Sequence, residues 1–480
     1  MKKIILFIFL PLLSIGQTQI GADIDGEAAH DYNGYSVSLS IDGSIIAIGA
    51  PFNDKNGIDS GTVRVYKNIL GTWTQVGSDI EGEEAGVVSG WSVSLSSDGS
   101  ILAIGAYRNN GNSGSVRVYK NVSETWVQIG SDIDGEAAGD ISGVSISLSS
   151  DGSILAIGAP QNDGNGTNSG SVRVYRNVSE TWIQIGSDID GKAAGDFIGN
   201  SVSLSGDGSI LAIGAPFIDS GLVRVYKNVS DIWTQVGSDI DGKAAGDENG
   251  YGISLSTDGS TLAIGAYKND GNGSNSGSVR VYKNVSGNWI KIGSDIDGEA
   301  ADNWSGFSVS LSNDGSVLAI GAPYNNGNGA ISGSVRVYKN VSGTWIKVGI
   351  DIDGEDGGDY SGISVSLSGD GSILAIGAHK NAGNEQSLGS VRVYDLFAVL
   401  SSDSFVLAHF SVYPNPASEL VTISLEEGLT LEKVNVYNTL GQLVKTENKD
   451  VVAVNSLAKG SYYFEVITNI GKATKQIIVQ

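Results

Sequence analysis

The feature that most constrains this chain is a sequence repeat with one fixed and one variable spacing. The phrase Ala-Ile-Gly-Ala begins seven times, at Ala47, Ala103, Ala156, Ala212, Ala263, Ala319 and Ala375. The phrase Val-Arg-Val-Tyr also begins seven times, at Val63, Val116, Val172, Val223, Val279, Val335 and Val391. Each valine precedes the next alanine by 40 residues, whereas the reverse interval varies from 11 to 16 residues. A period of 51 to 56 residues indicates a repeat architecture, in which each copy is one structural unit.

The third copy shows which elements one unit contains. Residues 144–149 alternate apolar and small polar side chains and predict a strand, and Asp-Gly then predicts a tight hairpin turn. We expect the second strand at 154–159, the third at 171–176 and the fourth at 181–186. The variable interval therefore falls in the loop between the second and third strands.

A four-stranded meander repeated seven times predicts a seven-bladed β-propeller, in an all-β protein. A β-solenoid is the alternative, but its coils are usually shorter than about 30 residues. The seventh copy lacks a fourth strand, and residues 17–24 match residues 73–80, which belong to a fourth strand. We therefore predict that the N-terminal strand closes the last blade. The propeller should span residues 17–394.

Composition excludes several classes of function. The chain has no cysteine, so it has no disulfide and no thiolate chemistry. Its formal net charge is −24, which argues against a nucleic-acid partner and is compatible with divalent cations or simple solubility. Residues 410–480 are nearly neutral, so almost all of the excess lies in the repeats.

The two ends of the chain differ from the repeats. Residues 1–16 are typical of a signal peptide, with cleavage expected between Gly16 and Gln17, and their apolar run is too short to span a bilayer. No transmembrane segment is expected in the mature protein. Residues 395–409 are predicted to be a linker. Residues 410–480 alternate in hydrophobicity between Asn, Gly and Pro turns, which predicts a small C-terminal β-sandwich.

One face of the predicted propeller carries the connectors between copies and the variable loops. Function concentrates on loops held by a rigid scaffold, so this face is the expected binding surface. Three connectors place carboxylates at positions 1, 3, 5 and 9, a spacing that could bind calcium. These sets are Asp23, Asp25, Glu27, Asp31; Asp132, Asp134, Glu136, Asp140; and Asp351, Asp353, Glu355, Asp359. The alternative, which we favour, is that these side chains cap turns and pair with the arginines of the repeats.

Aromatic residues fall into two groups. Six tryptophans recur once in each fourth strand and are expected to pack between blades, although exposed aromatic side chains can also stack on sugars. Trp91 and Trp304 break the repeat and are candidates for ligand contact. The recurring Asn-Val-Ser spells a glycosylation acceptor, but we favour a turn between the third and fourth strands.

The sequence gives little indication of a catalytic site. The chain has only three histidines, and it has no Ser/His/Asp set and no paired metal-binding histidines. We expect a non-enzymatic protein, a monomer, that binds a glycan or a protein. A propeller enzyme acting on polysaccharide and a structural envelope protein without a ligand are the alternatives.

The text Gly-x-Ser-Val-Ser-Leu-Ser-x-Asp-Gly-Ser-x-Leu-Ala-Ile-Gly-Ala-Pro, followed by Gly-Ser-Val-Arg-Val-Tyr, resembles FG-GAP repeats of integrin-alpha-type β-propellers. The resemblance implies a seven-bladed extracellular propeller used in adhesion or ligand binding. The family's calcium loop lies in the first hairpin of each blade, where this chain has only Ser-x-Asp-Gly-Ser. The family's calcium ligands therefore do not transfer to it.

The C-terminal segment resembles the type A sorting domain of the type IX secretion system. Four motifs match in order: residues 410–417 with Tyr413, Pro414, Asn415 and Pro416, then residues 434–444, 457–463 and 475–480. The resemblance implies passage through the periplasm, export across the outer membrane by the type IX machinery, and a secreted or surface-attached product.

Overall fold

The computed structural model describes residues 17–382, 387–400, 406, 409–426, 429–469 and 471–480. The predicted signal peptide, including Gly16, lies outside these residues, as does part of the predicted linker. The described chain divides into two compact units, residues 19–395 and residues 396–480. Strands dominate both units, as the all-β prediction requires.

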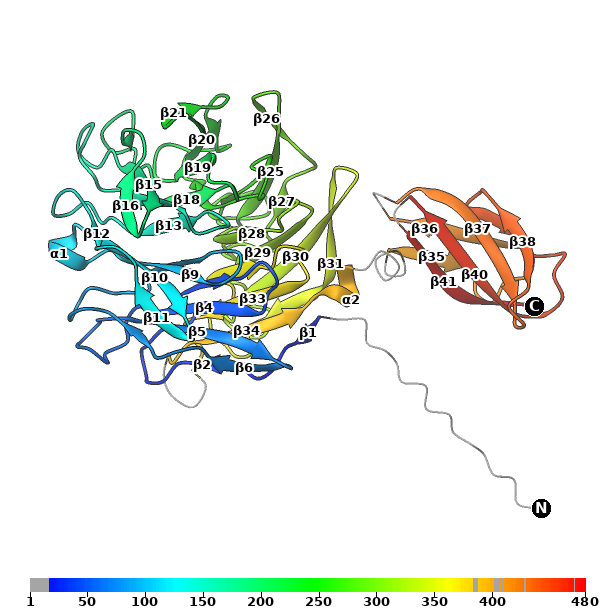
Figure 1. Ribbon diagram of the computed structural model, residues 1–480. Coiled ribbons are helices and arrows are strands. Elements are labelled where there is room, and N and C mark those ends of the chain that lie inside the picture. The colour runs from blue at the N-terminus through cyan, green and yellow to red at the C-terminus, as the bar shows by residue number, and fades with distance from the viewer. Residues whose placement is uncertain (1–16, 383–386, 401–405, 407–408, 427–428, 470) are drawn as a thin grey trace, which may run out of the picture. The chain divides into compact units, whose positions relative to one another are not determined.

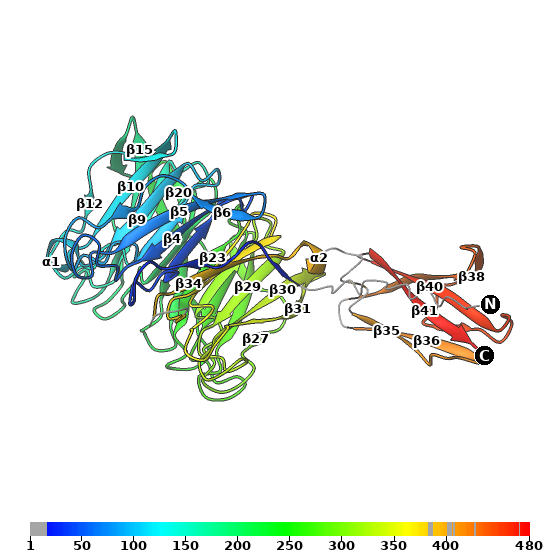
Figure 2. The ribbon, with the colours of Figure 1, turned by 90° about the horizontal axis from the view of Figure 1, so that it is seen from below.

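The first unit consists of seven antiparallel sheets, each numbered here after its copy of the repeat. In sheets 1 to 6 the strands pair in sequence order from inside to outside. Figures 1 and 2 show the sheets following one another in colour from blue through cyan and green to yellow. This radial, repeated arrangement is β-propeller-like.

The inner strands are short and half-buried. They are β3 (Ser36–Leu39), β8 (Ser92–Leu95), β13 (Ser145–Leu148), β18 (Ser201–Leu204), β23 (Asn249–Leu255), β28 (Ser308–Leu311) and β32 (Ser364–Leu367). The second strands are buried on both faces. They are β4 (Ile45–Ala50), β9 (Ile101–Ala106), β14 (Ile154–Ala159), β19 (Ile210–Ala215), β24 (Thr261–Ala266), β29 (Val317–Ala322) and β33 (Ile373–Ala378).

In sheets 1 to 6 the third strands run two residues further than the third copy predicts, whereas β34 has the predicted length. They are β5 (Thr62–Ile69), β10 (Ser115–Val122), β15 (Ser171–Val178), β20 (Leu222–Val229), β25 (Ser278–Val285), β30 (Ser334–Val341) and β34 (Ser390–Asp395). The turn to the fourth strand is correspondingly tight, with positive φ at Ser179 and Glu180 in sheet 3. The outer strands are β6 (Thr72–Gln75), β11 (Thr125–Gln128), β16 (Thr181–Gln184), β21 (Ile232–Gln235), β26 (Asn288–Lys291) and β31 (Thr344–Asp353).

The connector between sheets also contributes a strand, which the sequence analysis did not predict. Its Asp-Ile-Asp segment turns back and pairs with the start of the third strand, as Ile133 pairs with Val116. These short strands are β2 (Ile24–Asp25), β7 (Ile80–Glu81), β12 (Ile133–Asp134), β17 (Ile189–Asp190), β22 (Ile240–Asp241) and β27 (Ile296–Asp297). In sheet 6 the outer strand β31 continues into this pairing. One short helical turn, α1 (Asn109–Asn112), lies in a variable loop.

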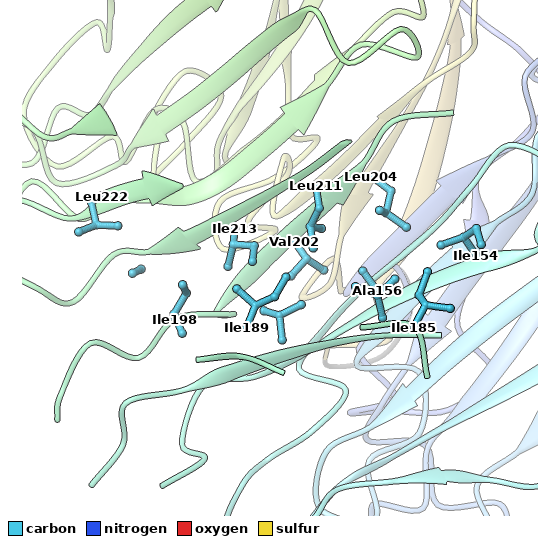
Figure 3. Close-up of a cluster of buried hydrophobic side chains, with 13 residues drawn as sticks. Ile154, Ala156, Ile185, Ile189, Ile198, Val202, Leu204, Leu211, Ile213 and Leu222 are labelled. Atoms are coloured by element: carbon cyan, nitrogen blue, oxygen red, sulfur yellow. The ribbon is translucent and has the colours of Figure 1, made fainter. Parts of the chain in front are cut away.

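Neighbouring sheets approach one another so closely that the repeat requires glycine in the second strand. A Cβ placed on Gly105 would lie 2.2 Å from the carbonyl oxygen of Gly143 in the next sheet. Apolar side chains fill the remaining space between sheets, as in the cluster that joins Ala156 and Val174 of sheet 3 to Leu204 and Ile213 of sheet 4 (Figure 3). The invariant Ala-Ile-Gly-Ala phrase therefore encodes the contact between sheets.

A ring of backbone hydrogen bonds joins the hairpin turns of successive sheets. The N–H of Ile41 donates to the carbonyl of Ser97, at 2.8 Å, and the same bond is repeated from turn to turn. The series continues through Ser150, Gly206, Thr257, Asn313 and Gly369, and then returns to Ile41. A second series joins the inner strands, in which each leucine N–H donates to a serine Oγ of its neighbour at 3.0 Å.

The N-terminal segment is the outer part of sheet 7. The strand β1 (Thr18–Gln19) pairs with β34, and in Figure 1 the blue start of the chain lies beside the yellow β34. The N–H of Ile20 donates to the carbonyl of Val393 at 2.7 Å, and Ile24 packs in the cluster between sheets 7 and 1. The match between residues 17–24 and residues 73–80 predicts this position.

The second unit begins with α2 (Phe397–Leu400) and contains two sheets. One sheet has the order β35-β36-β39, and the other has the order β38-β37-β40-β41. The strands are β35 (Phe410–Tyr413), β36 (Leu420–Leu425), β37 (Leu431–Asn438), β38 (Leu443–Glu447), β39 (Val451–Ala453), β40 (Gly460–Thr468) and β41 (Gly471–Val479). Buried residues of both sheets, such as Val421 and Phe464, form an apolar interior, as in a small sandwich.

Candidate functional site

The aspartate at the ninth connector position, one of the calcium candidates, accepts hydrogen bonds from the backbone of a turn. The Oδ2 atom of Asp31 accepts hydrogen bonds from the backbone N–H groups of Glu27 and Ala28, at 3.1 and 3.0 Å. Asp140 and Asp359 accept equivalent bonds in their own connectors. All three aspartates are buried. Each carboxylate therefore fixes the course of its connector.

The first connector position bonds to the outer strand that precedes it. Asp23 accepts a hydrogen bond from Nε2 of Gln19 at 2.7 Å, and Asp132 accepts the same bond from Gln128. Asp351 forms an ion pair with a lysine at the corresponding place. These carboxylates anchor the connector to the sheet that it leaves.

The remaining positions of the three sets have other surroundings. Glu27 forms an ion pair with the buried Arg64 at 3.3 Å, whereas Glu136 and Glu355 accept hydrogen bonds from asparagines of the variable loops. The third-position carboxylates lie on strands that pair with the third strand of the sheet that the connector leaves: Asp25, Asp134 and Asp353. Burial, followed by the charge of Asp23, raises the pKa of Asp25.

In this structure the carboxylates of each predicted calcium set have separate partners. Among the described residues, no group of three histidine, aspartate or glutamate side chains is placed to hold a metal ion. Calcium binding stays a prediction for Asp23, Asp25, Glu27, Asp31, Asp132, Asp134, Glu136, Asp140, Asp351, Asp353, Glu355 and Asp359.

The connectors instead position one large side chain in most sheets at the place where the chain enters the inner strand. The residue that follows the ninth connector position adopts a left-handed backbone in every sheet, with φ between 49° and 57°. These residues are Tyr32, Val88, Ile141, Phe197, Glu248, Trp304 and Tyr360. Such a conformation is unusual for residues other than glycine, and unusual backbone of this kind often marks a functional site.

These residues and their neighbours form what we call the aromatic arc. Its members come from three places in each unit: the end of the connector, the first residue before the inner strand and the start of the variable loop. The aromatic arc comprises Tyr32, Tyr35, Phe52, Trp91, Tyr107, Tyr251, Tyr267, Trp304, Phe307, Tyr324, Tyr360 and His379. Most of these side chains are half-buried and keep a surface open to solvent, whereas Tyr267 and His379 are buried.

Both tryptophans predicted as ligand contacts belong to the aromatic arc. The ring centroid of Trp91 lies 4.4 Å from that of Tyr35 and 4.7 Å from that of Tyr107. The ring centroid of Trp304 lies 3.9 Å from that of Tyr324 and 5.0 Å from that of Tyr267. The structure thus places the two candidates within a shared surface.

His379 connects the arc residues of sheet 7 with those of sheet 1. Its imidazole makes edge contacts with Tyr32, Tyr35 and Tyr360, at centroid distances of 5.3, 5.6 and 5.4 Å. Tyr360 then contacts Tyr324 at 5.1 Å. Ring contacts therefore run without interruption from sheet 5 through sheets 6, 7 and 1 to sheet 2.

A cavity of about 250 Å³ opens beside the arc. It is lined by the first residues of the inner strands of all seven sheets, including Tyr35, Trp91 and Tyr251. At the position of Tyr35, sheets 3 and 7 line the cavity with Val144 and Ile363, and sheets 4 and 6 line it only with inner-strand residues such as Val202 and Val309. Aromatic, aliphatic and serine side chains therefore share the lining.

Three buried ionisable groups of the arc, His379, Tyr35 and Tyr251, stay uncharged near neutral pH. Burial, followed by the charge of Lys380, lowers the pKa of His379 to about 3. Burial, Glu248 and another arc tyrosine raise the pKa of Tyr251 to about 12, and burial raises the pKa of Tyr35. The tyrosine hydroxyls therefore remain hydrogen-bond donors, and the histidine remains neutral.

Three cations lie against the rings of the arc. The Lys380 Nζ atom is 4.4 Å from the ring centroid of Tyr360, and the guanidinium of Arg108 is 5.5 Å from that of Tyr107. Lys268 forms an ion pair with Glu248. Cations at these distances are attracted by the ring face.

The repeated tryptophans of the outer strands pack between sheets, as expected. The Nε1–H of Trp126 donates to the carbonyl of Val76 in the preceding unit at 3.0 Å, and its ring packs in the cluster between sheets 1 and 2. The Asn-Val-Ser segment is likewise structural in this conformation, because the Asn177 Oδ1 atom accepts the N–H of Glu180 across the turn.

Sequence reasoning missed most of the aromatic arc, although a signal was present. The position of Tyr32 carries six residue types among the seven copies, and so does the position of Tyr35, whereas the adjoining Gly and Ser-Leu-Ser text hardly changes. Positions that differ inside an otherwise uniform repeat are not required by the common scaffold. Comparing the copies with one another would have identified the arc.

The predicted sorting motif lies at the start of the second unit. Tyr413 ends β35 with an exposed side chain, and Pro414 and Pro416 follow. Asn415 donates from Nδ2 to the carbonyl of Gln476 at 2.9 Å and accepts the N–H of the residue two further on. The motif is thus bonded to the last strand. Among the described residues, no helix has the length and apolar character needed to cross a membrane.

Two families of known proteins match parts of this chain. A family described as "FG-GAP repeat" matches residues 22–66 and 239–282, and a family described as "Secretion system C-terminal sorting domain" matches residues 411–480. A search of curated proteins gave no significant match.

Solved structures resemble the chain at low identity. A chain of Kuenenia stuttgartiensis hydrazine synthase is 14% identical with a TM-score of 0.51, and the match covers 76% of this chain and 96% of that one. A functionally unknown protein from Desulfotomaculum acetoxidans is 15% identical with a TM-score of 0.45, covering 67% and 89% of the two chains. At 14% identity the similarity to hydrazine synthase concerns the fold alone.

The sorting domain also implies an interaction with the type IX secretion machinery. The chain thus joins FG-GAP repeats in a β-propeller-like unit to a C-terminal sorting domain that marks proteins exported by the type IX system to the cell surface or secreted.

Proposed function

We propose that this protein is an exported seven-bladed β-propeller that acts in adhesion by binding a ligand through the aromatic arc, as a monomer and without catalysis. Support for seven blades comes from the hydrogen-bond series that starts at Ile41, passes through one turn of each sheet and returns to Ile41. A closed ring leaves each inner strand bonded on both sides, so the blades need no second copy for closure.

The observation that carries the proposal is the concentration of large, half-buried aromatic side chains at positions where the copies differ. A residue needed only for the scaffold would recur in every blade, as the glycine at Gly105 does. Among the described residues, uninterrupted ring contacts run through sheets 5, 6, 7, 1 and 2, whereas sheet 4 carries a separate pair, Phe197 and Phe217, so the arc marks one sector of a nearly symmetric ring. A binding site on a repeat protein needs such a departure from symmetry.

A binding role is favoured over catalysis by the chemistry of the arc. His379 is the histidine of this surface, and its buried, neutral ring contacts aromatic neighbours and no carboxylate among the described residues. General base catalysis needs a group whose pKa lies near the working pH and which can reach a substrate. The arc offers stacking surfaces and hydrogen-bond donors instead.

The proposal is tested with the mature chain, residues 17–480, on arrays of polysaccharides and of extracellular proteins. We expect binding to at least one class of probe, and we expect Trp91→Ala to weaken it about tenfold or more, because buried aromatic contacts dominate binding surfaces. Binding that Trp91→Ala leaves unchanged would place the ligand elsewhere, and turnover of a bound polysaccharide would favour an enzyme. No binding to any probe would favour a structural envelope role.

A further inference from the structure

We infer that the ligand of the aromatic arc is a neutral polysaccharide chain. The inference rests on the proposed function and adds the chemical class of the ligand. Three observations carry it: strained backbone under the rings, hydrogen-bond donors that stay protonated beside them, and the charge of the chain.

The first observation is that large side chains occupy positions where glycine would be less strained. Trp304 and Tyr360 have φ values of 57°, and both N–H groups are bonded to carbonyls of the adjacent variable loop. The chain does use glycine where only the backbone matters, as at Gly306, two residues after Trp304. Val88 and Ile141 adopt the same backbone outside the arc, so the conformation belongs to the repeat, and what the arc adds is the choice of a large ring at Trp304 and Tyr360.

The second observation is the combination of ring surfaces with polar donors. Neighbouring rings of the arc are mostly tilted or edge-on to one another, with an interplanar angle of 85° between Tyr324 and Tyr360. Successive rings thus alternate faces and edges along the arc. Tyr35 and Tyr251 line the cavity that adjoins it, and burial keeps their hydroxyls protonated by raising the pKa of both groups. Sugar rings present C–H faces bordered by hydroxyl groups, which such a surface matches.

The third observation is charge. The chain carries a formal net charge of −24, and a polyanion would be repelled by it. Lys268 is neutralised by Glu248, and Lys380 and Arg108 lie against ring faces. Lys380 and Arg108 keep their charge against the rings, but they belong to sheets 7 and 2, so the arc does not gather its cations into the cluster that phosphate or sulfate chains require, and a ligand without charge is favoured.

An extended peptide is a poorer match, because the inner strands have no free edge at the arc. The N–H of Leu39 donates to the serine Oγ of the neighbouring sheet, and Leu95 and Leu367 donate in the same way. A peptide that adds to a sheet needs unpaired backbone groups along a strand. A polysaccharide needs none.

The experiment is affinity electrophoresis of the mature chain through native gels that contain one soluble polysaccharide. The neutral probes are laminarin, hydroxyethyl cellulose and galactomannan, and the anionic probes are alginate and heparin. We expect retardation by at least one neutral probe, unchanged between low and about 0.5 M salt, because no counterions are released. Trp304→Gly is expected to reduce the retardation at least about tenfold.

Leu70→Gly is the matched control. Leu70 is fully exposed in a turn of sheet 1 with φ of 53°, so this substitution also replaces a large left-handed residue by glycine, but outside the arc. It should leave the retardation unchanged. Tyr324→Ala provides a second arc variant, and the melting temperature of each variant shows whether it is folded.

The outcomes separate the inference from the proposed function. Two outcomes overturn the neutral polysaccharide but keep the binding function. In the first, binding depends on the arc, is limited to anionic probes and is abolished by salt. In the second, binding depends on the arc and is limited to proteins. Retardation that Trp304→Gly and Tyr324→Ala leave intact in folded protein overturns both assignments to the arc. Absence of retardation by any neutral probe also overturns the inference.

Discussion

At the scale of single residues, the same set of aspartate hydrogen bonds recurs in the hairpin turns between the first and second strands, opposite the aromatic arc. Asp98 accepts hydrogen bonds from the Oγ of Ser96 at 2.7 Å and from the N–H and Oγ of Ser100 at 2.9 and 2.8 Å. Burial raises the pKa of Asp98, but these bonds outweigh burial and the net pKa is lowered. The equivalent aspartates of the other turns show the same direction: Asp42, Asp151, Asp207, Asp258, Asp314 and Asp370.

This chemistry predicts a loss of stability in acid. A carboxyl group whose pKa is lower in the folded protein stabilises it above the unfolded pKa of about 3.9, and this contribution is lost as the pH falls through the folded pKa. Asp98→Asn should therefore lower the melting temperature at about pH 7, and the difference from the parent should narrow below about pH 4. Thermal unfolding followed by circular dichroism across this range measures it.

The control for that prediction is Asp356→Asn, which makes the same chemical change at an exposed connector position. Its melting temperature should follow that of the parent at both pH values. If Asp98→Asn and the parent differ equally at pH 7 and pH 3, the stabilisation does not come from the ionised carboxylate.

At the scale of elements, the repeated tryptophan of the outer strands differs in its hydrogen bonding from sheet to sheet. The indole N–H of Trp126 is bonded to the carbonyl of Val76, whereas the buried Nε1 atoms of Trp289 and Trp345 have no hydrogen-bond partner among the described residues. The sequence around these tryptophans is nearly the same in each copy. The difference arises from the geometry of each pair of sheets.

Substitution by phenylalanine tests this difference. Trp126→Phe removes a hydrogen bond and leaves a carbonyl without its donor, so it should cost about 1 kcal/mol more than Trp289→Phe, which loses ring area alone. Chemical denaturation of the two variants and the parent gives the comparison. Equal losses would indicate that ring packing accounts for the whole contribution of these tryptophans.

At the scale of the whole molecule, the N-terminal segment holds the ring together. The carbonyl of Ile20 accepts the indole N–H of Trp73 at 2.9 Å, the N–H of Ile20 bonds to Val393, and Ile24 is buried between sheets 7 and 1. One short segment therefore contacts the first and the last sheets at once.

Deleting residues 17–24 should lower the melting temperature by several degrees, because sheet 7 loses its outer strand and the seam between sheets 7 and 1 loses Ile24. Adding a synthetic peptide of residues 17–24 at excess concentration should restore part of the loss, and a scrambled peptide should not. An unchanged melting temperature after the deletion would contradict this closure.

The sequence predicted the fold of the repeats well because seven copies repeat the same local signals. The second strand was located to the residue, at 154–159, and the role of residues 17–24 followed from their match with residues 73–80. The partners of the calcium candidates could not be predicted, because spacing along a connector does not determine the direction of its side chains. Asp31 points to the backbone of its own turn, which no count of residues reveals.

The aromatic arc could be predicted only in part, because it combines residues that are far apart in the sequence. Trp91 and Trp304 were noticed as departures from the repeat, but their contacts with Tyr107 and Tyr324 depend on the return of the chain after the second strand. His379 was not singled out, since a lone histidine carries no pattern.

Sheet 7 is built from strands at both ends of the repeats, and this affects how the chain folds. Sheets 1 to 6 each draw their strands from one continuous stretch, so each can form locally, whereas sheet 7 must wait for residues from both ends of the repeats. Contacts across such a separation form slowly. During that delay the open edge of β34 can accept the N-terminal strand of a second chain, and refolding at high concentration is therefore expected to yield dimers that have exchanged this strand.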